Sequence, residues 1–304
     1  MANFERHEGG LQPAEVKRQT LANQPASARA DLRNNRLKKR LFPYWLLLPT
    51  LILLLFLNVY PLIYSVKVSF TSFNTFGQAF GFAGLENYAR ILQDAHFWGS
   101  LGTTVLYTFV VVAAEMTLGL ALALVLGNEK RFTGVLQWVL IIPMMISPLI
   151  VGVIWKLMYN TDMGIINYIL NSAGLSSINW LGDPTLAFLS VVVVDIWQWT
   201  PMCFLIILAG LRSLPTDPFE SAKIDGASAW QILQRITIPM LKPVLLVALL
   251  IRTMDALKTF DQIFVLTKGG PGRATETISF LMYQTAYKFS QFGLAAAGLF
   301  IVLI

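Results

Sequence analysis

The sequence has 304 residues, of which 55% are hydrophobic and 13% are charged, and its mean hydropathy is +0.60. Soluble globular chains carry about a quarter charged residues, because their surface faces water, so this composition excludes an ordinary soluble domain. The formal charge is +6, but nine of the 23 basic residues lie before residue 41, which argues against a nucleic-acid groove. A single cysteine, Cys203, excludes an internal disulfide, and with only His7 and His96 we expect no metal site.

The first part of the chain differs in composition from the rest. Residues 1–36 are polar and show no apolar periodicity, which predicts a disordered arm. Residues 37–304 are predicted to form a transmembrane domain, because a bilayer core about 30 Å thick needs roughly 20 apolar residues per helix. The predicted spans are residues 41–64, 103–126, 135–157, 186–208, 243–266 and 293–304. The last is too short to cross a bilayer, so we expect this helix to be truncated. The predicted fold is an all-α integral membrane protein with about six helices.

Basic residues in the loops predict the orientation of these helices in the membrane. With the amino terminus inside, the inner segments hold 15 Lys and Arg residues and the outer segments hold four. Basic residues concentrate on the cytoplasmic side of membrane proteins. We therefore expect a multi-pass protein of the cell (inner or plasma) membrane whose amino terminus is cytoplasmic.

The predicted inner loop over residues 211–242 has the sequence of two short helices joined by a tight turn. Asp217, Pro218 and Glu220 are typical of a helix start, with Asp217 as the N-cap. Gly226 is placed to end that helix in a left-handed conformation. Ser228 is expected to cap a second helix, which Pro239 would end. On these residues alone, an ordinary capped amphipathic loop is the competing interpretation.

Longer stretches of the sequence carry a resemblance to a known family. The run Glu220-Ser221-Ala222-Lys223-Ile224-Asp225-Gly226-Ala227, with Ile236-Thr237-Ile238-Pro239 after it, resembles the EAA motif of permease subunits of binding-protein-dependent ABC importers. Ser221 stands where that motif usually has Ala. Further matches resemble the branch of the family that imports oligosaccharides, monosaccharides and glycerol-phosphate compounds. They are residues 85–88, 180–184, 208–211, 260–267 and 269–271.

The resemblance implies a function and a set of partners. It implies the membrane-spanning, non-enzymatic subunit of an ATP-driven importer of sugars or glycerol-phosphate-type solutes. Its partners would be ABC ATPase subunits, a second and usually different permease subunit, an extracytoplasmic solute-binding protein and the lipid bilayer. The chain itself would bind no cofactor, since ATP would bind to the partner subunits. The residues expected to couple the loop to the ATPase are Glu220, Ser221, Ala222, Asp225, Gly226 and Ala227.

Ionisable residues within the predicted spans need a physical reason, because each costs about 2.5–3.5 kcal/mol on insertion scales. The fifth span carries Arg252, Asp255, Lys258 and Asp261 at every third position, which favours a ladder of ion pairs for the first two and a translocation pathway for the last two. The fourth span offers aromatic rings and hydrogen-bonding groups that suit a sugar, although its tryptophans could equally pack against a helix. The predicted pathway residues are Asp195, Trp197, Gln198, Trp199, Lys258 and Asp261. Glu115 in the second span is expected to be buried against a polar partner.

Two other functional classes compete with the importer subunit. A secondary carrier driven by an ion gradient is the main alternative, but the sequence shows no convincing internal repeat of the kind such carriers often have. A membrane enzyme would need a nucleophile with a base or a metal cluster, and no catalytic residue is predicted because His, Cys and carboxylates are sparse and scattered. The sequence contains no phosphate-binding loop of the Walker type, so any ATP chemistry would belong to a partner.

Overall fold

A computed structural model describes residues 26–127 and 133–303 of the chain. The chain divides into two units, residues 1–65 and 66–304. Residues 1–25 of the predicted arm lie outside the described residues, as do Lys130 and Arg131, two of the basic residues counted in the inner segments. The first helix, α2 (Ala26–Ser69), begins inside the predicted arm. Residues 26–36 are rich in Ala and Arg, which are good helix formers, and this explains why the helix extends beyond the apolar run.

The first unit consists of most of α2. Its stretch Pro43–Ser69 is long and apolar enough to cross a membrane, with a mean hydropathy of 2.3 over its best window. The side chains of residues 43–64 are all exposed. A helix that is apolar on every side is stable only against lipid or other apolar surfaces, so α2 is a membrane span by composition.

The described residues contain four helices able to span a membrane, or five if one bent pair counts as a single span, compared with the six that the sequence predicts. The four are Pro43–Ser69 of α2, α4 (Ala95–Gly127), α8 (Pro184–Arg212) and the run Ala229–Leu266. The sixth predicted span corresponds to α14 (Phe292–Leu303), an apolar helix of 12 residues.

The bent pair lies where the sequence predicts the third span, residues 135–157. It consists of α5 (Thr133–Met145) and α6 (Pro148–Met158), and the two helices meet at 101°. Pro148 is the first residue of α6, and Ser147 before it is extended, with φ −56° and ψ 135°. A residue that precedes proline is pushed out of the helical region, so the predicted span is broken completely at this point.

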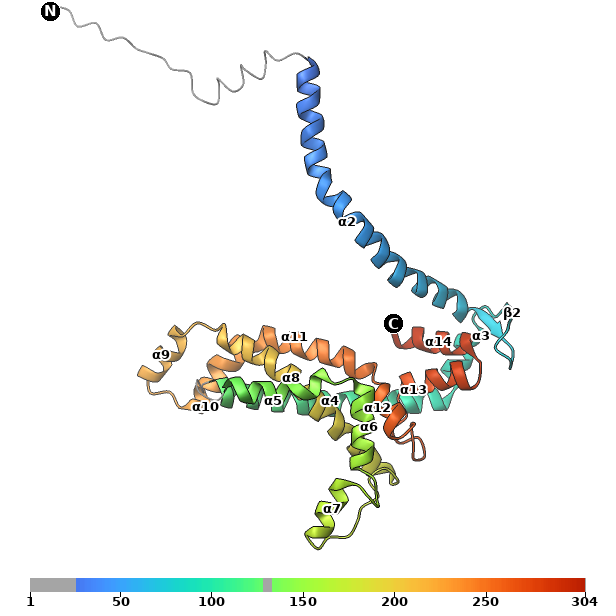
Figure 1. Cartoon of the computed structure of the whole chain (residues 1–304), viewed down its shortest axis with the longest axis vertical. Coiled ribbons are helices and arrows are strands. Elements are labelled where there is room, and N and C mark those ends of the chain that lie inside the picture. The colour runs from blue at the N-terminus through green and yellow to red at the C-terminus, as the bar shows by residue number, and fades with distance from the viewer. Residues whose placement is uncertain (1–25, 128–132, 304) are drawn as a thin grey trace, which may run out of the picture. The chain divides into compact units, whose positions relative to one another are not determined.

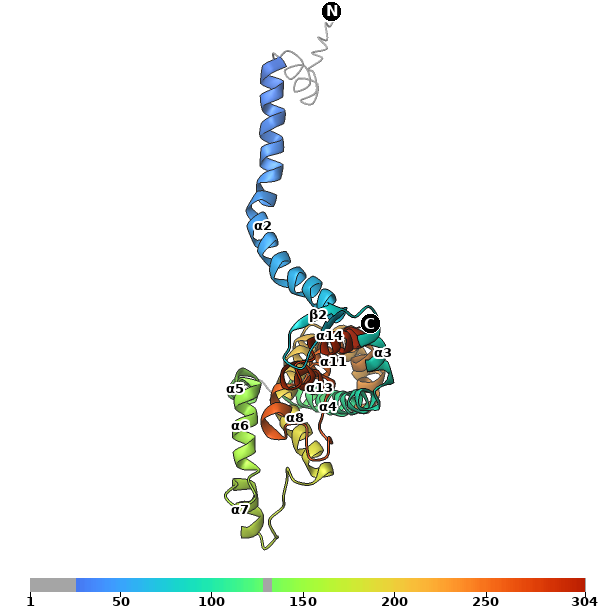
Figure 2. The ribbon, with the colours of Figure 1, turned by 90° about the vertical axis from the view of Figure 1, so that its right-hand side faces the viewer.

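Three long helices of the second unit, α4, α8 and α11 (Ile238–Leu257), pack against one another (Figure 1). Figure 2 looks along these helices and shows α6 and α7 (Ile165–Ser172) running across them. The approach of α4 to α8 is close at Gly119, where an added Cβ would lie 2.8 Å from the Cβ of Cys203. Such small residues allow helix backbones to approach closely in membranes.

The predicted inner loop forms three consecutive helical segments, α9 (Asp217–Ile224), α10 (Ala229–Ile232) and a π-helix (Leu233–Thr237) that continues into α11. Two details of the prediction are wrong. Thr216, and not Asp217, occupies the N-cap position of α9, and it makes no side-chain cap. Pro239 does not end the second helix, because the π-turn before it lets the chain continue into α11, where Pro239 sits in the first turn.

The remaining elements are short and lie at the ends of the long helices. They are β1 (Thr71–Phe73), β2 (Ala79–Phe82), α3 (Glu86–Gln93), α12 (Asp261–Leu266), α13 (Ile278–Tyr283) and a second π-helix (Gln284–Lys288). The two strands pair antiparallel. Asn87 of α3 is buried and donates hydrogen bonds to the carbonyls of Ser69 (2.9 Å) and Thr71 (3.1 Å), which fixes the hairpin against α3.

Candidate functional site

The loop between α8 and α11 forms the predicted elbow. At the end of α9, the N–H of Ala227 donates to the carbonyl of Ala222 at 2.9 Å, and the N–H of Gly226 donates to the carbonyl of Lys223 at 3.1 Å. These two bonds form a Schellman motif, which needs a left-handed residue, and Gly226 has a φ of +74°. The predicted glycine turn is therefore present.

The second arm of the elbow begins with a complete capping box. The Ser228 N–H donates to Oε1 of Gln231 at 2.7 Å, and the Gln231 N–H donates to Oγ of Ser228 at 3.3 Å. Both orphan donors at the start of α10 are thereby satisfied within the loop. Because both ends of the turn are held by local bonds, the elbow has a defined shape without contributions from the rest of the chain.

The elbow is exposed. Neither α9 nor α10 buries a residue, and the large apolar side chains of Ile224 and Trp230 are 87% and 64% exposed. The six predicted coupling residues lie together on this elbow, with Ala222 and Ala227 half-buried and Glu220, Ser221, Asp225 and Gly226 exposed. Large apolar groups that project next to small residues on a surface are typical of a protein contact.

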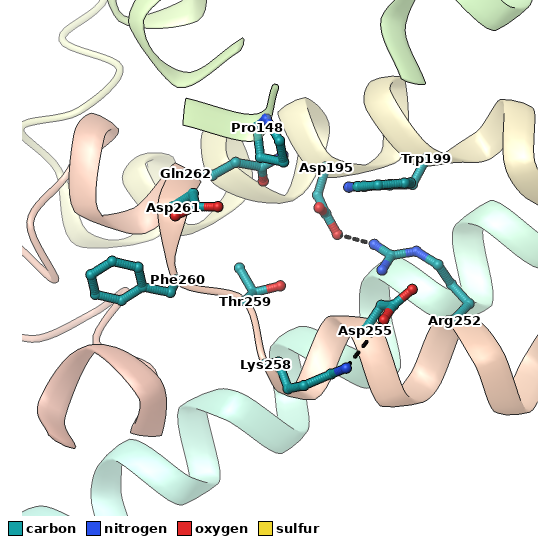
Figure 3. Close-up of a pocket in the computed structure, with 10 residues that line it drawn as sticks. All are labelled: Pro148, Asp195, Trp199, Arg252, Asp255, Lys258, Thr259, Phe260, Asp261 and Gln262. Atoms are coloured by element: carbon teal, nitrogen blue, oxygen red, sulfur yellow. Dashed lines mark hydrogen bonds and ion pairs between the residues drawn. The ribbon is translucent and has the colours of Figure 1, made fainter. Parts of the chain in front are cut away.

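A second site is a cavity of about 300 Å³ beside α8 and the end of α11 (Figure 3). Its lining joins charged, hydrogen-bonding and aromatic side chains from three parts of the chain. The lining residues are Pro148, Asp195, Trp199, Arg252, Asp255, Lys258, Thr259, Phe260, Asp261 and Gln262. A cavity with aromatic walls and a few polar groups is typical of a small-molecule site.

Behind this cavity lies a buried cluster of three ionisable side chains from three helices. The guanidinium of Arg252 donates to both oxygens of Glu115, at 2.5 and 3.0 Å, and to Oδ2 of Asp195 at 2.5 Å. All three side chains are at most 2% exposed. The ring of Trp199 lies 5.5 Å from the guanidinium carbon. The cluster joins α4, α8 and α11 at one point and forms one wall of the cavity.

Two glutamines extend the polar network toward the break in the third predicted span. Nε2 of Gln262 donates to Oε1 of Gln198 at 2.7 Å, and Nε2 of Gln198 donates to the carbonyl of Ile146 at 2.9 Å. Ile146 lies in the break between α5 and α6, where its carbonyl has no helical partner. The network therefore satisfies backbone that the bend leaves open, next to the cavity.

The fifth predicted span is also discontinuous at the cavity. Helix α11 ends at Leu257 and α12 begins at Asp261, and Thr259 and Phe260 between them line the cavity. Discontinuous helices in membranes place irregular backbone where it faces a cavity and not lipid. The break thus puts Lys258 and Asp261 at the cavity instead of along one helix face.

The structure brings together most of the predicted pathway residues but not all of them. Asp195, Trp199, Lys258 and Asp261 line the cavity, and Gln198 is buried behind it. Trp197 instead packs against Trp155, with ring centroids 5.5 Å apart. That separation follows from the helix, in which consecutive residues point about 100° apart.

The ion pair expected between Arg252 and Asp255 is absent. Lys258 pairs with Asp255 at 3.4 Å, but Arg252 pairs with Glu115 and Asp195 from other helices and not with Asp255. Glu115 is buried against a polar partner, as expected. Thr259, Phe260 and Gln262 also line the cavity but are not among the predicted pathway residues. The matched run 260–267 gave a signal for Phe260 and Gln262, because Asp261 and Gln262 interrupt an apolar stretch there, whereas Thr259 lies just before that run.

The sequence of this chain is similar to those of several known proteins. The family model described as "Binding-protein-dependent transport system inner membrane component" matches residues 115–304. The trehalose/maltose transport system permease protein of Thermococcus litoralis is 42% identical over 84% of this chain and 86% of its own length. The trehalose transport system permease protein of Mycobacterium tuberculosis is 35% identical over 86% of this chain and 84% of its own length.

A third relative and a solved structure extend the comparison. The sulfoquinovosyl glycerol transport system permease protein of Agrobacterium fabrum is 35% identical over 85% of this chain and 84% of its own length. The crystal structure of a bacterial ABC transporter involved in the import of the acidic polysaccharide alginate contains a chain of similar fold. It matches with a TM-score of 0.77 at 25% identity, over 89% of this chain and 93% of that one.

Proposed function

The chain belongs to the family of inner membrane components of binding-protein-dependent transport systems, and from this premise we propose that it forms half of the translocation pathway of an ATP-driven sugar importer. The observation that carries the proposal is the exposed elbow of α9 and α10, which stands within the segment that the family model matches. The names of the relatives that transport trehalose and maltose support a sugar as cargo.

The elbow would be the contact with an ATPase subunit. Its shape is held by the Schellman turn at Gly226 and the capping box at Ser228, so it can transmit a push as a rigid body. The exposed side chains of Ile224 and Trp230 would be buried by the partner. The π-helix joins α10 to α11 without a loop, so a movement of the elbow would reach α11 and the cavity at its far end. ATP would bind to the partner, and this chain would catalyse no reaction.

The cavity would be this chain's part of the sugar pathway. Trp199 and Phe260 offer ring faces to the C–H surface of a sugar, and Asp195, Asp261 and Gln262 offer oxygens to its hydroxyls. The site lies at the ends of discontinuous helices, as sites in transporters often do. A second permease subunit would close the pathway, and a solute-binding protein would deliver the sugar from the outer side. The proposed orientation, with the amino terminus in the cytoplasm, would place the elbow on the ATPase side.

Two substitutions in the elbow test this proposal in the importer reconstituted with its ATPase, second permease and solute-binding protein. Glu220→Arg reverses a charge on α9, and Gly226→Pro removes the N–H that donates to Lys223 and cannot adopt a φ of +74°. Both variants should lose most ATP-dependent sugar uptake and the associated ATP hydrolysis. The matched controls are Glu86→Arg, at an exposed position of α3, and Gly174→Pro, an exposed glycine with a φ of +81° in another turn.

Unchanged uptake-linked ATP hydrolysis in both elbow variants would overturn the coupling role. The energy source is tested in the same vesicles. Uptake should stop when the ATPase subunit is inactivated and should continue when the proton gradient is dissipated. The opposite pattern would identify a carrier driven by an ion gradient.

A further inference from the structure

The charges around the cavity indicate which kind of sugar it accepts. Three aspartates and two cations line the cavity, so its lining has a net charge of −1. Glu115 lies directly behind the lining in contact with Arg252 and brings the local charge to −2. If one carboxylate of the buried cluster holds a proton, the local charge is still −1. The site is therefore negative in either state.

Both cations of the lining are already paired with carboxylates. The guanidinium of Arg252 is shared between two buried carboxylates and covered by the ring of Trp199. The Lys258 ammonium lies 3.4 Å from the Asp255 carboxylate in an exposed pair, whose side chains are 73% and 43% accessible. A negative cargo can share Lys258 with Asp255 at little cost, whereas separating Arg252 from its buried carboxylates is costly because it leaves a charge uncompensated.

The groups that remain available at the cavity are hydrogen-bond acceptors. Asp261 makes no ion pair within residues 26–127 and 133–303 and is exposed. Gln262 is 2% exposed, and its Oε1 has no hydrogen-bond partner among the described groups, although its Nε2 is bonded to Gln198. A buried acceptor without a donor is costly, so it favours a ligand that brings one. Sugar hydroxyls donate hydrogen bonds, whereas phosphate, sulfonate and carboxylate groups at neutral pH accept them.

We propose that this cavity selects uncharged saccharides and rejects sugars that carry phosphate, sulfonate or carboxylate groups, with Asp261 as the main determinant. The inference rests on the proposed function and narrows its cargo. Like charges brought together at a binding site oppose association strongly, so the preference should be large. The relatives include transporters named for neutral and for anionic cargo, and the family alone therefore does not settle this choice.

The test compares trehalose with trehalose 6-phosphate, which differ only in the charged group. Binding of each radiolabelled sugar is measured on the purified importer in nanodiscs without the solute-binding protein, so that the selectivity of that protein does not enter. The wild-type importer should bind trehalose at least tenfold more tightly than trehalose 6-phosphate. Asp261→Lys should lower the ratio of the affinity for trehalose to the affinity for trehalose 6-phosphate at least tenfold. Asp261→Asn should lower this ratio by a smaller factor. Asp162→Lys, the same change on an exposed loop away from the cavity, should leave it unchanged.

The outcomes separate this inference from the proposed function. ATP-dependent uptake of trehalose together with equal affinity for both sugars would overturn the charge selection and leave the importer function intact. An unchanged ratio in Asp261→Lys, in protein that still hydrolyses ATP and transports trehalose, would also overturn it. If the complete importer moves neither this sugar nor maltose on ATP, the proposed function fails and the inference fails with it.

Discussion

At the scale of single residues, the buried guanidinium of Arg252 determines the stability of the helix bundle. It is 1% exposed and lies between two carboxylates that are equally buried. Replacing a buried ion pair by apolar groups is often neutral, but removing one partner leaves a buried charge uncompensated and costs about 3–5 kcal/mol. The position of Arg252 therefore makes it more sensitive to substitution than any exposed arginine of the chain.

We predict that Arg252→Met lowers the free energy of unfolding by about 3–5 kcal/mol, because Glu115 and Asp195 stay buried without a cation. Chemical denaturation of the detergent-purified protein measures this change. Adding Glu115→Gln to the same variant should restore part of the loss. Arg90→Met, on an exposed face of α3, is the control and should stay within about 0.5 kcal/mol of wild type. Equal stability of Arg252→Met and wild type would mean that the cluster does not support the fold.

The partners of Arg252 show what sequence spacing leaves undetermined. Positions 252, 255, 258 and 261 have a spacing that predicts pairs within one helix, and the pair between Lys258 and Asp255 follows this rule. Arg252 instead bonds to residues 137 and 57 positions away. A buried cation gains more from two desolvated carboxylates than from one exposed neighbour, and this depends on packing that no local pattern contains.

At the scale of elements, the contact between α4 and α8 depends on glycine. A Cβ added at Gly119 would lie 2.8 Å from the Cβ of Cys203 and 2.9 Å from the backbone nitrogen of Phe204. Backbone cannot move aside as a flexible side chain can, so the two helices would have to separate. Gly102, on an exposed part of α4, has nothing within 4 Å of an added Cβ.

Alanine at these two glycines should therefore have opposite effects. We predict that Gly119→Ala destabilises the protein by about 1–3 kcal/mol through overpacking. Gly102→Ala should leave stability unchanged or raise it by up to about 1 kcal/mol, since alanine is the better helix former. Thermal unfolding in one detergent compares the two directly. A melting temperature of Gly119→Ala at or above that of Gly102→Ala would contradict the tight contact between α4 and α8.

Local sequence rules predict the turns and caps of individual helices, but they do not predict how the chain continues or bends between helices. The turn at Gly226 and the cap at Ser228 were predictable, because each depends on residues within one turn of helix. The passage through Pro239 was not, since the π-helix over Leu233–Thr237 has no sequence pattern that marks it. The bend between α5 and α6 was predictable as a kink from Pro143 and Pro148, but its angle of 101° was not.

At the scale of the whole molecule, composition determines the class of protein and leaves the number of spans open. Hydropathy measures the length of an apolar run but does not detect a break inside it. For this reason residues 135–157 and 243–266 were each predicted as one span. In the structure both runs are interrupted, by the bend after α5 and by the break between α11 and α12. These two breaks border the cavity, so the places where hydropathy gives no sign of a break are the places that form the candidate site.

The orientation of the chain follows from the same whole-molecule reasoning and is open to direct test. Cys203 is the only cysteine, and it is 1% exposed, so the wild-type protein provides an unreactive background for cysteine labelling. Ile224 on the elbow is 87% exposed and Met163 between α6 and α7 is 92% exposed. The predicted excess of basic residues on the inner side places Ile224 in the cytoplasm and Met163 outside.

We predict that a membrane-impermeant maleimide labels Ile224→Cys in inside-out vesicles only and Met163→Cys in right-side-out vesicles only, with wild type unlabelled in both. Co-expression of the ATPase subunits should reduce labelling of Ile224→Cys, because docking would bury that position, and should leave Met163→Cys unaffected. The reverse sidedness would invert the orientation and remove the elbow from the ATPase side of the membrane. Correct sidedness without protection by the ATPase would leave the orientation standing and would show that the elbow docks elsewhere or not at all.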